Sequence, residues 1–367
     1  MKSVQYRGKP KKILVIYTGG TFGMSEQLEI PKLSERELKA RLERGVPEMK
    51  RIADCTVRIA FNMDSCQMGL DHWIRIASLL HQGAREVDGA VVLHGTDTLA
   101  YTASALSFLL GKPPIPIVLT GAQKPLSALR NDARGNLLTA LEVAAHPPRE
   151  LRNRVMVAFH DELFLGTRVR KLSALRFSAF ESPRFPILAK VGGLIQYRNS
   201  IFHLPPLPPK TGRVPGLPPA TLNQSKAASI LKLEVTPEFP GSVFDSRILE
   251  SLDGILLTLY TSGTAPTEIP GFLPFLRAAR KASVPVFAIT EREDAPAALS
   301  SYAAGKTLIR EGVLWCRDLT PEAAFVKAQV LHLRQRIGQG QSKHAYLQWL
   351  GKSWHENLSD ESSSGLL

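Results

Sequence analysis

Short apolar runs alternate with helical patterns through the first 200 or so residues of the chain. The apolar runs are residues 12–17, 89–94, 115–120 and 154–159. They are rich in valine and isoleucine and lack strict alternation, which is typical of strands buried on both faces of a parallel sheet. Residues 96–110 place leucine and alanine along one helical stripe, and Ser34 with Glu37 forms a capping box. This order predicts an open α/β sheet with helices on both faces.

The alternation stops at a proline-rich segment, residues 204–226. Proline in this density cannot continue a helix or a central strand and favours extended, semi-rigid chain, so we interpret the segment as a linker. A PxxP ligand for a partner domain is an alternative interpretation of the same composition. Beyond it the strand pattern resumes at residues 229–234, 254–260 and 284–290.

Length and composition agree with two domains. At roughly 150 residues per domain, 367 residues make two, and 44% hydrophobic with 22% charged residues describes an ordinary globular protein. We expect a larger, doubly wound, mostly parallel N-terminal domain over 1–203, joined by the 204–226 linker to a smaller C-terminal α/β domain over 227–341. Residues 342–367 are expected to be a polar tail.

The sequence also predicts where the protein is found. No apolar run approaches the ~18 residues that a membrane span needs. Basic residues precede the apolar residues 13–17, but this run is too short for the core of a signal peptide. Cys55, Cys66 and Cys316 have no metal-type spacing, as expected of thiols in a reducing compartment. We therefore expect a cytoplasmic protein.

The net charge is strongly positive, with 46 basic and 33 acidic residues leaving +13. Such a charge is compatible with nucleic acid, an anionic membrane surface or acidic substrates, and equally with a basic solvated surface. Residues 1–58 hold 13 basic and seven acidic residues, a local +6. The aromatic residues there are Tyr6, Tyr17 and Phe22, too few to indicate stacking of bases. Charge alone assigns no function.

Three of the predicted strands end in small polar residues. These turns are residues 18–23 (TGGTFG), 94–98 (HGTDT) and 120–123 (TGAQ). Because the carboxyl ends of parallel strands line the ligand crevice of an open α/β sheet, we expect the three turns to converge. Glycine lets a ligand approach the backbone, whose N–H groups can donate to a carboxylate or a developing oxyanion, and threonine supplies hydroxyls.

Taken singly, each turn also has a purely structural interpretation. Residues 18–21 fit a tight turn and lack the spacing of the dinucleotide and P-loop motifs. His94, at the end of an apolar strand, fits a satisfied core histidine, and Thr96 with Asp97 at a helix start fits an N-cap with a dipole-compensating acid. The combination of all three turns favours a functional site.

Together the three motifs resemble those of the L-asparaginases of threonine amidohydrolase type. The resemblance covers roughly residues 12–330, and residues 71–77 (DHWIRIA) and 180–183 (FESP) are more similar to the cytoplasmic type I branch. It implies a homodimer or homotetramer that hydrolyses L-asparagine to L-aspartate and ammonia. No metal, organic cofactor, membrane or nucleic acid is implied.

The resemblance also implies roles for individual residues. Thr21 matches the nucleophile, while Thr96, Asp97 and Lys171 match the second threonine with its acid and lysine. A lysine beside these groups can act as the base that a poorly nucleophilic hydroxyl needs. The residues expected to bind the substrate are Gly20, Ser65, Gln67, Gly95, Thr96, Asp97 and Ala122.

Within that set the implied contacts differ. Ser65 is expected to hold the substrate α-carboxylate, Asp97 its α-ammonium, and the carbonyl of Ala122 its amide NH2. Backbone N–H groups of Thr21 and Thr96 are expected to stabilise the tetrahedral oxyanion, a contribution of roughly 3 kcal/mol per donor in other enzymes. Which threonine attacks first is not visible in a sequence.

Five positions depart from the family pattern. Glu29 stands where many members carry a lid tyrosine, and Cys66 with Gln67 replaces a serine and an acid. Thr167 replaces the usual asparagine before the lysine, and Thr264 replaces an asparagine in a segment that often completes a neighbouring subunit's site. We therefore expect substrate range and rate to differ from other members.

Two other functions remain open. The glutaminase subunit of a tRNA-dependent amidotransferase has a similar core and would suit the positive charge, although such subunits usually carry an extra N-terminal domain and only about a dozen residues precede the first strand here. A non-catalytic, nucleic-acid-binding or ligand-sensing protein of the same fold is the second alternative. Salt-dependent retention of RNA or DNA would favour it.

Overall fold

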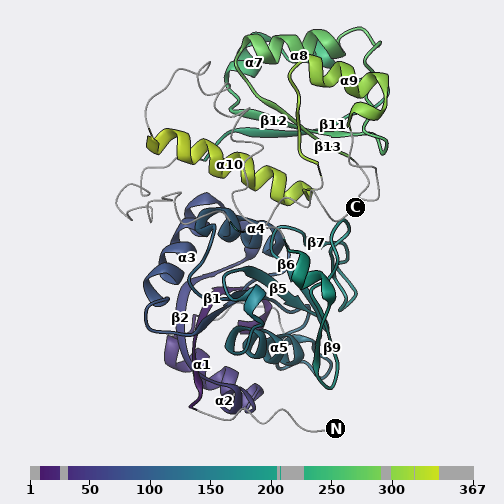
Figure 1. The fold of residues 1–367 in the computed structure, drawn as a ribbon. Coiled ribbons are helices and arrows are strands. Elements are labelled where there is room, and N and C mark those ends of the chain that lie inside the picture. Colours follow the sequence, from purple (N-terminus) through teal and green to yellow (C-terminus); the bar gives the residue numbers. More distant parts are fainter. Residues whose placement is uncertain are drawn as a thin grey trace. The chain divides into compact units, whose positions relative to one another are not determined.

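The computed structural model describes residues 9–24, 32–204, 207, 227–290, 299–317 and 319–338. Contacts divide the chain into two compact units, with the described residues up to 207 in the first and those from 227 in the second (Figure 1). Most of the proline-rich segment, the polar tail and Glu29 lie outside the described residues. Each unit is an α/β structure.

The first unit is built on an eight-stranded sheet with the order β10-β9-β6-β5-β4-β3-β1-β2. Its strands are β1 (Lys11–Gly19), β2 (Ala53–Met63), β3 (Gly89–Leu93), β4 (Ile117–Thr120), β5 (Val155–Phe159), β6 (Glu162–Leu165), β9 (Ala189–Val191) and β10 (Ile195–Tyr197). The strands from β2 to β5 pair in parallel, whereas β6, β9 and β10 extend the sheet in antiparallel fashion. The prediction of a mostly parallel sheet is confirmed.

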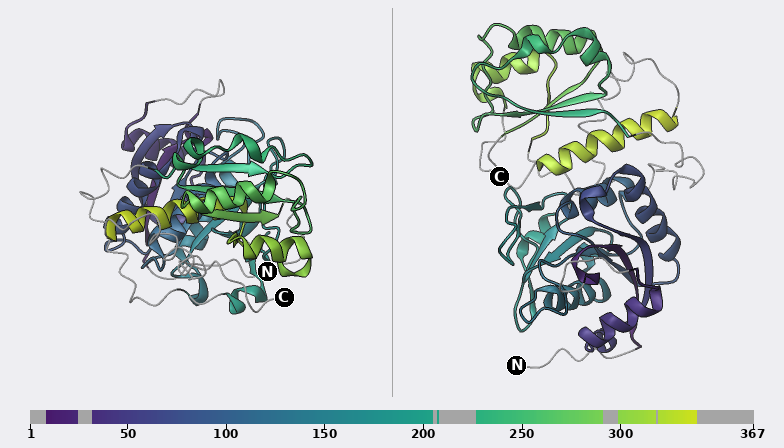
Figure 2. Two further views of the ribbon diagram at one scale, coloured as in Figure 1. Left: turned by 90° about the horizontal axis from the view of Figure 1, so that it is seen from above. Right: turned by 180° about the vertical axis from the view of Figure 1, so that it is seen from behind.

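Helices cover both faces of this sheet (Figure 2). They are α1 (Glu35–Gly45), α2 (Met49–Ile52), α3 (Leu70–Gly83), α4 (Leu99–Leu110) and α5 (Ala133–Ala145). Alternate residues of β1 face opposite sides, so that Val15 belongs to a core with α1 and α5, and Ile16 to a core with α3 and α4. A central strand buried on both faces explains why its sequence is almost entirely apolar.

The predicted capping box starts α1 as expected. The backbone N–H of Ser34 donates to Glu37 Oε2 over 2.8 Å, and the N–H of Glu37 donates to Ser34 Oγ over 3.3 Å. The helix predicted at 96–110 begins later, at Leu99, with Thr98 as its N-cap. Thr96 and Asp97 therefore lie in the loop that precedes α4, a difference that leaves their side chains available for other contacts.

Strand order places two of the motif-bearing turns at a topological switch point of the sheet. From β1 the chain forms β2 on one side, and then returns through α3 to β3 on the other side of β1. This reversal is the topological switch point at which open α/β sheets bind ligands, beyond the carboxyl ends of the strands. Thr21 follows β1 and Thr96 follows β3, so both lie at that edge.

The second unit has a four-stranded parallel sheet with the order β11-β12-β13-β14. Its elements are β11 (Ile230–Glu234), α7 (Ser246–Glu250), β12 (Gly254–Leu259), α8 (Phe272–Lys281), β13 (Val286–Thr290), α9 (Ala303–Arg310), β14 (Leu314–Trp315) and α10 (Pro321–Gly338). Apolar side chains of α7, α8 and α9 pack against one face of the sheet, and α10 lies against the strands from β11 to β13. In neither unit is a described helix both long and apolar enough to cross a membrane.

Candidate active site

Thr21 lies in a closed turn directly after β1. It opens the short 3-10 helix η1 (Thr21–Gly23), and the N–H groups of Gly23 and Met24 donate to the carbonyls of Gly20 and Thr21 over 3.2 and 3.1 Å. Gly20 has φ 77°, a left-handed conformation that glycine adopts without strain. The turn is held from outside by Arg41 of α1, whose two terminal nitrogens donate to the carbonyls of Gly23 and Met24.

Gly20 and Gly95 bring the first two turns into direct backbone contact. A Cβ atom on Gly20 would lie 2.6 Å from the Cα of Gly95, and a Cβ on Gly95 would lie 2.7 Å from the side chain of Ser65. Side chains at either position would push these segments apart. The glycines therefore allow the segments that carry Thr21, Ser65 and Thr96 to lie next to one another, which is part of the convergence predicted for the three turns.

Thr96, Asp97 and Lys171 form a hydrogen-bonded cluster. The Nζ of Lys171 donates to Thr96 Oγ1 over 2.7 Å and to Asp97 Oδ1 over 2.6 Å. The Lys171 side chain is 17% exposed, whereas that of Asp97 is 64% exposed and so stays accessible to a ligand. A lysine nitrogen at this distance from a hydroxyl is placed to exchange a proton with it. The structure thus brings these three residues together, and the relay that the resemblance implies for them stays a prediction.

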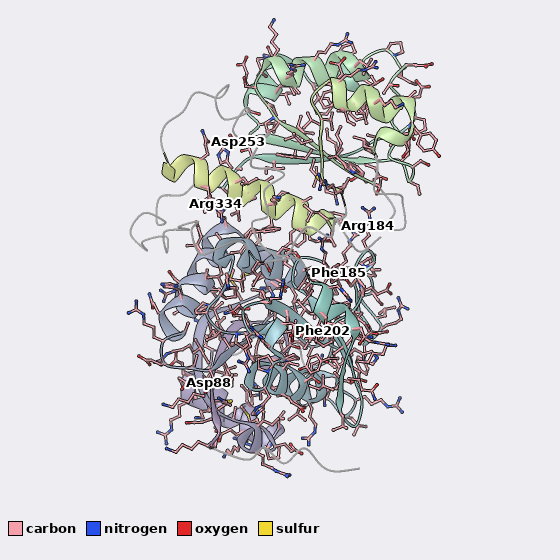
Figure 3. All side chains as sticks on the ribbon, in the orientation of Figure 1. Asp88, Arg184, Phe185, Phe202, Asp253 and Arg334 are labelled. Atoms are coloured by element: carbon pink, nitrogen blue, oxygen red, sulfur yellow. The ribbon has the colours of Figure 1, made fainter. Side chains whose placement is uncertain are left out.

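A buried segment delivers Lys171 to this cluster. Thr167 and Arg168 are almost completely inaccessible, and the Arg168 guanidinium lies 5.7 Å from the ring centre of Phe185, which is labelled in Figure 3. Lys171 itself ends the short strand β7 (Arg170–Lys171), which pairs with β8 (Phe180–Glu181). From the sequence alone, Lys171 would be interpreted as an exposed residue of a surface loop. In the structure its side chain is largely buried.

The structural interpretation of Thr96 and Asp97 does not hold. Thr98 is the N-cap of α4, and its hydroxyl donates to the carbonyl of Ser65 over 2.7 Å rather than capping the helix. The hydroxyl of Thr96 accepts from Lys171 and lies 3.4 Å from Gln123 Oε1. Neither side chain is used to start the helix, so both can serve the site.

His94, in contrast, is the satisfied core histidine that was expected. It is 1% exposed, and its ring nitrogens contact the carbonyl of Gly95 at 2.7 Å and the hydroxyl of Thr102 at 2.8 Å. Burial lowers the pKa of His94 to about 4, which the bond to Gly95 only partly offsets. The ring is neutral at physiological pH and is separated from solvent.

The third turn, after β4, is fixed by acid and amide side chains of the neighbouring chain segment. Asp132 accepts the backbone N–H of Gln123 over 2.9 Å and that of Lys124 over 3.0 Å, and Asn136 donates to the carbonyl of Gly121 over 2.9 Å. Because a trans peptide holds its C=O and N–H in opposite directions, Asp132 also sets the direction of the Ala122 carbonyl. Ala122 itself is buried, at 1% exposure.

Two residues at this turn were not predicted from the sequence. Gln123 lies within 3.4 Å of the Thr96 hydroxyl, and its Nε2 donates to the carbonyls of Ser173 and Arg176 over 3.3 and 3.2 Å. It thereby links the turn after β4 to the segment that follows Lys171. Gln123 is visible as the last residue of the third motif, but Asp132 carries no local signal, since its role depends on a fold-back of nine residues.

Ser65, Cys66 and Gln67 form the 3-10 helix η2 (Ser65–Gln67) at the end of β2. Ser65 is buried at 3% exposure, while Cys66 and Gln67 are exposed, and Gln67 Nε2 donates to Cys66 Sγ over 3.6 Å. Desolvation raises the pKa of the Cys66 thiol, and the charges of Asp64 and Asp97 raise it further. The two departures from the family pattern therefore stand beside the site with neutral side chains.

Thr264, a further departure from the family pattern, lies in the second unit. It belongs to a tight turn in which the N–H of Tyr260 donates to the Thr264 carbonyl over 3.2 Å and the N–H of Gly263 donates to the Tyr260 carbonyl over 2.8 Å.

Among the residues that the structure describes, no group of three or more His, Cys, Asp or Glu side chains is arranged to hold a metal ion.

Comparison with known protein families shows to which family this chain belongs. The family described as "Asparaginase, N-terminal" matches residues 12–202, and the "Glutaminase/Asparaginase C-terminal domain" matches residues 230–343. The chain belongs to the asparaginase family. It is therefore an amidohydrolase by family, and the expectation from the three motifs is confirmed.

Individual members of the asparaginase family are similar over most of their length. L-asparaginase 1 of Escherichia coli strain K12 is 35% identical over 88% of this chain and 91% of its own. The structure of L-asparaginase I from Vibrio cholerae has a TM-score of 0.78 at 33% identity and covers 96% of this chain and 99% of its own. One subunit of the glutamyl-tRNA(Gln) amidotransferase of Pyrococcus abyssi is 29% identical, over 87% of this chain and 72% of its own.

Proposed function

We propose that this protein is an L-asparaginase that hydrolyses the side-chain amide of L-asparagine to L-aspartate and ammonia. The observation that carries the proposal is the contact of Lys171 Nζ with both Thr96 Oγ1 and Asp97 Oδ1, next to the backbone junction of Gly20 and Gly95. Hydroxyl, amine and carboxylate in this order are the components of an activated hydroxyl. Relatives that share most of the chain are named L-asparaginases.

In this mechanism the two threonines divide the chemistry. Thr21 attacks the amide carbon. Lys171, as the neutral amine, takes up the Thr21 hydroxyl proton through the Thr96 hydroxyl and returns it to the leaving nitrogen, so that ammonia leaves and a covalent aspartyl ester remains. Water then attacks the ester beside Thr96, which restores Thr21 and releases L-aspartate. Backbone N–H groups of the two turns stabilise the oxyanion in each step.

The same geometry supports a substrate pose. The exposed carboxylate of Asp97 would take the α-ammonium, and Ser65, at the base of the site, the α-carboxylate. The carbonyl of Ala122 would accept from the amide nitrogen, because Asp132 holds that peptide in a fixed direction. We also propose, from the resemblance, that the enzyme is a cytoplasmic homodimer or homotetramer.

Ammonia release from asparagine and glutamine, measured side by side over a range of concentrations, tests the proposal. We expect turnover of asparagine that falls by a factor of about 10³ or more in Thr21→Ala and in Thr96→Ala, since activated hydroxyls act as a unit. Intact-protein mass spectrometry of each variant with a slow substrate shows which threonine carries the ester. Unchanged turnover in Thr21→Ala would contradict the mechanism.

A glutaminase subunit of a tRNA-dependent amidotransferase is the second candidate, since the amidotransferase subunit of Pyrococcus abyssi is similar over most of this chain. That function predicts ammonia release from glutamine rather than asparagine, and stimulation by glutamyl-tRNA with a partner subunit. A non-catalytic protein that binds nucleic acid predicts no turnover and retention on RNA that falls steeply between about 50 and 200 mM salt. The two assays separate all three candidates.

A further inference from the structure

A buried chain of three hydrogen bonds ends at the peptide that carries the Thr96 N–H. Trp73 Nε1, on α3, donates to Thr102 Oγ1 over 3.0 Å, and Thr102, on α4, contacts His94 Nε2 at 2.8 Å. His94 Nδ1 in turn contacts the carbonyl oxygen of Gly95 at 2.7 Å. Trp73, His94 and Thr102 are each at most 4% exposed, so water does not compete for these bonds.

The direction of every bond in this chain is fixed by chemistry. A carbonyl oxygen only accepts, so His94 Nδ1 must carry the proton that reaches Gly95. The neutral ring then has an acceptor at Nε2, to which the Thr102 hydroxyl donates. An indole N–H only donates, so the Thr102 oxygen accepts from Trp73. One histidine tautomer thus satisfies all the partners, and the low pKa of His94 keeps the ring neutral.

Fixing the Gly95 carbonyl also fixes the next N–H. The peptide between Gly95 and Thr96 is planar and trans, so its N–H points opposite to its C=O. Since the C=O points at the buried ring of His94, the Thr96 N–H points in the opposite direction, away from that ring. A donor aimed in that direction is what a developing oxyanion requires.

Gly95 needs such an external hold. Glycine has the greatest backbone freedom of any residue, and a side chain at this position is excluded by Ser65. Gly20 lies against the Cα of Gly95, and Gly121 packs against the carbonyl of His94. These contacts limit where the backbone lies, but the bond from His94 sets the rotation of the peptide plane.

We propose that His94 is a positioning residue, which, held by Thr102 and Trp73, aims the backbone N–H of Thr96 at the oxyanion of the amide undergoing hydrolysis. The proposal rests on the proposed function for its substrate. In this proposal His94, which is buried and neutral, affects the chemical step through the Thr96 N–H and does not contact the substrate. The geometry of the three bonds carries it.

The sharpest test changes one hydroxyl. Thr102→Val has the same shape but cannot donate to His94, whereas Thr102→Ser retains the donor. We expect Thr102→Val to lower kcat about tenfold or more, since loss of one oxyanion donor costs about 10²- to 10³-fold and a misaimed one less. The KM for asparagine and the Kd of the product L-aspartate should stay within about twofold, and Thr102→Ser should restore kcat.

Ser107→Ala is the matched control. Ser107 lies on the same helix, is 1% exposed, and donates to the carbonyl of Ala103 over 2.8 Å, so its loss removes a buried hydroxyl without touching Gly95. We expect Thr102→Val and Ser107→Ala to lose similar amounts of unfolding free energy. Only Thr102→Val should have a lower kcat, and its Kd for L-aspartate should stay unchanged. Equal kcat in the two variants, or a loss of kcat matched by a loss of L-aspartate binding, would overturn the proposal.

A second readout needs no substrate. In a 15N-labelled protein, Thr102→Val should shift the Thr96 amide resonance and speed its hydrogen exchange, while Thr102→Ser and Ser107→Ala should leave both unchanged. If the wild-type protein releases no ammonia from asparagine, the proposed function has failed, yet the resonance still reports whether His94 orients this peptide. An unshifted Thr96 amide in Thr102→Val would contradict the positioning role by itself.

Discussion

Asp132 accepts the backbone N–H of Gln123 with both carboxylate oxygens, at 3.0 and 2.9 Å. The bond crosses a turn of nine residues and orients the carbonyl of Ala122, which we assign to the amide nitrogen of the substrate. An 8% exposed carboxylate is therefore committed to backbone geometry, with Asn136 as a further donor to it over 3.1 Å. Backbone N–H bonds to a carboxylate are among the stronger hydrogen bonds in proteins.

Asp132→Asn should accordingly raise KM more than it lowers kcat. The amide keeps one acceptor oxygen but places NH2 against the N–H of Gln123 or Lys124, so the Ala122 carbonyl loses its fixed direction. We expect a KM increase of about tenfold and a loss of about 1–3 kcal/mol in the free energy of unfolding. Steady-state kinetics with asparagine and urea denaturation measure the two.

Asp88→Asn provides the control for that prediction. Asp88, labelled in Figure 3, directly precedes β3 and accepts the backbone N–H of Lys12 over 2.9 Å. This bond lies at the amino ends of β1 and β3, whereas the site lies beyond their carboxyl ends. That bond, with Lys11, lowers the pKa of Asp88. The control should lose stability and keep its KM. A KM change shared by both variants would show that Asp132 has no special role.

Replacing Lys171 separates chemistry from binding. Lys171→Met keeps the length of the side chain but removes both bonds to Thr96 and Asp97, so we expect kcat to fall by about 10³-fold, as in other sites where a catalytic partner is removed. The Kd of L-aspartate, measured by calorimetry, should change much less. Lys190→Met, which removes an exposed lysine of β9 paired with Glu162, should behave as wild type. A kcat within about threefold of wild type in Lys171→Met would exclude the relay.

The sequence predicted the centre of this fold better than its edges. Strands β1, β3, β4 and β5 are buried on both faces, so each reads as a continuous apolar run. The edge strand β2 buries alternate residues at its start, Ala53, Cys55 and Val57, and the polar residues between them, Asp54 and Thr56, interrupt the apolar pattern. The antiparallel strands β6, β9 and β10 are short, with three or four residues each, and carry too little pattern to be predicted.

The site was predictable as far as its motifs are local. Thr21, Thr96 and Asp97 lie in turns that can be read directly from the sequence. Lys171 was assigned through the family resemblance, because its partners are 74 and 75 residues away. Asp132, Arg41 and Thr102 act through backbone groups or through other side chains, and their contacts exist only once the chain has folded.

Acid should weaken the fold through His94. Its pKa in the folded protein is about 4, below the value of about 6.5 in an unfolded chain. Between these values the unfolded chain binds one more proton, so this stabilisation is complete above pH ~6.5 and is lost as the pH falls toward 4. The loss amounts to about 2 kcal/mol between pH ~7 and ~5. The free energy of unfolding, measured by urea denaturation at these two pH values, should fall by about 2 kcal/mol less in His94→Asn than in the wild-type protein. Equal losses in both proteins would contradict the prediction.

Arg41 connects the Thr21 turn to the core beneath it. Its guanidinium donates over 2.9 and 3.0 Å to the carbonyls of Gly23 and Met24, and the buried hydroxyl of Tyr17 lies 3.4 Å from the carbonyl of Gly20. Burial raises the pKa of Tyr17 to about 12 although the charge of Arg41 lowers it, so Tyr17 remains a neutral donor. The turn is thus held at Gly20, Gly23 and Met24, on both sides of Thr21.

Arg41→Lys should therefore cost activity although the charge is kept. A lysine offers no planar pair of donors for two successive carbonyls, so Thr21 loses its fixed position. We expect kcat to fall about tenfold, because displacement of a reacting group by about 1 Å costs up to about 10²-fold, and the amides of Gly23 and Met24 to exchange faster. Arg44→Lys, an exposed position on the same helix, is the control. Faster exchange with unchanged kcat would show that order in this turn does not limit the reaction, whereas unchanged exchange would show that Arg41 does not hold it.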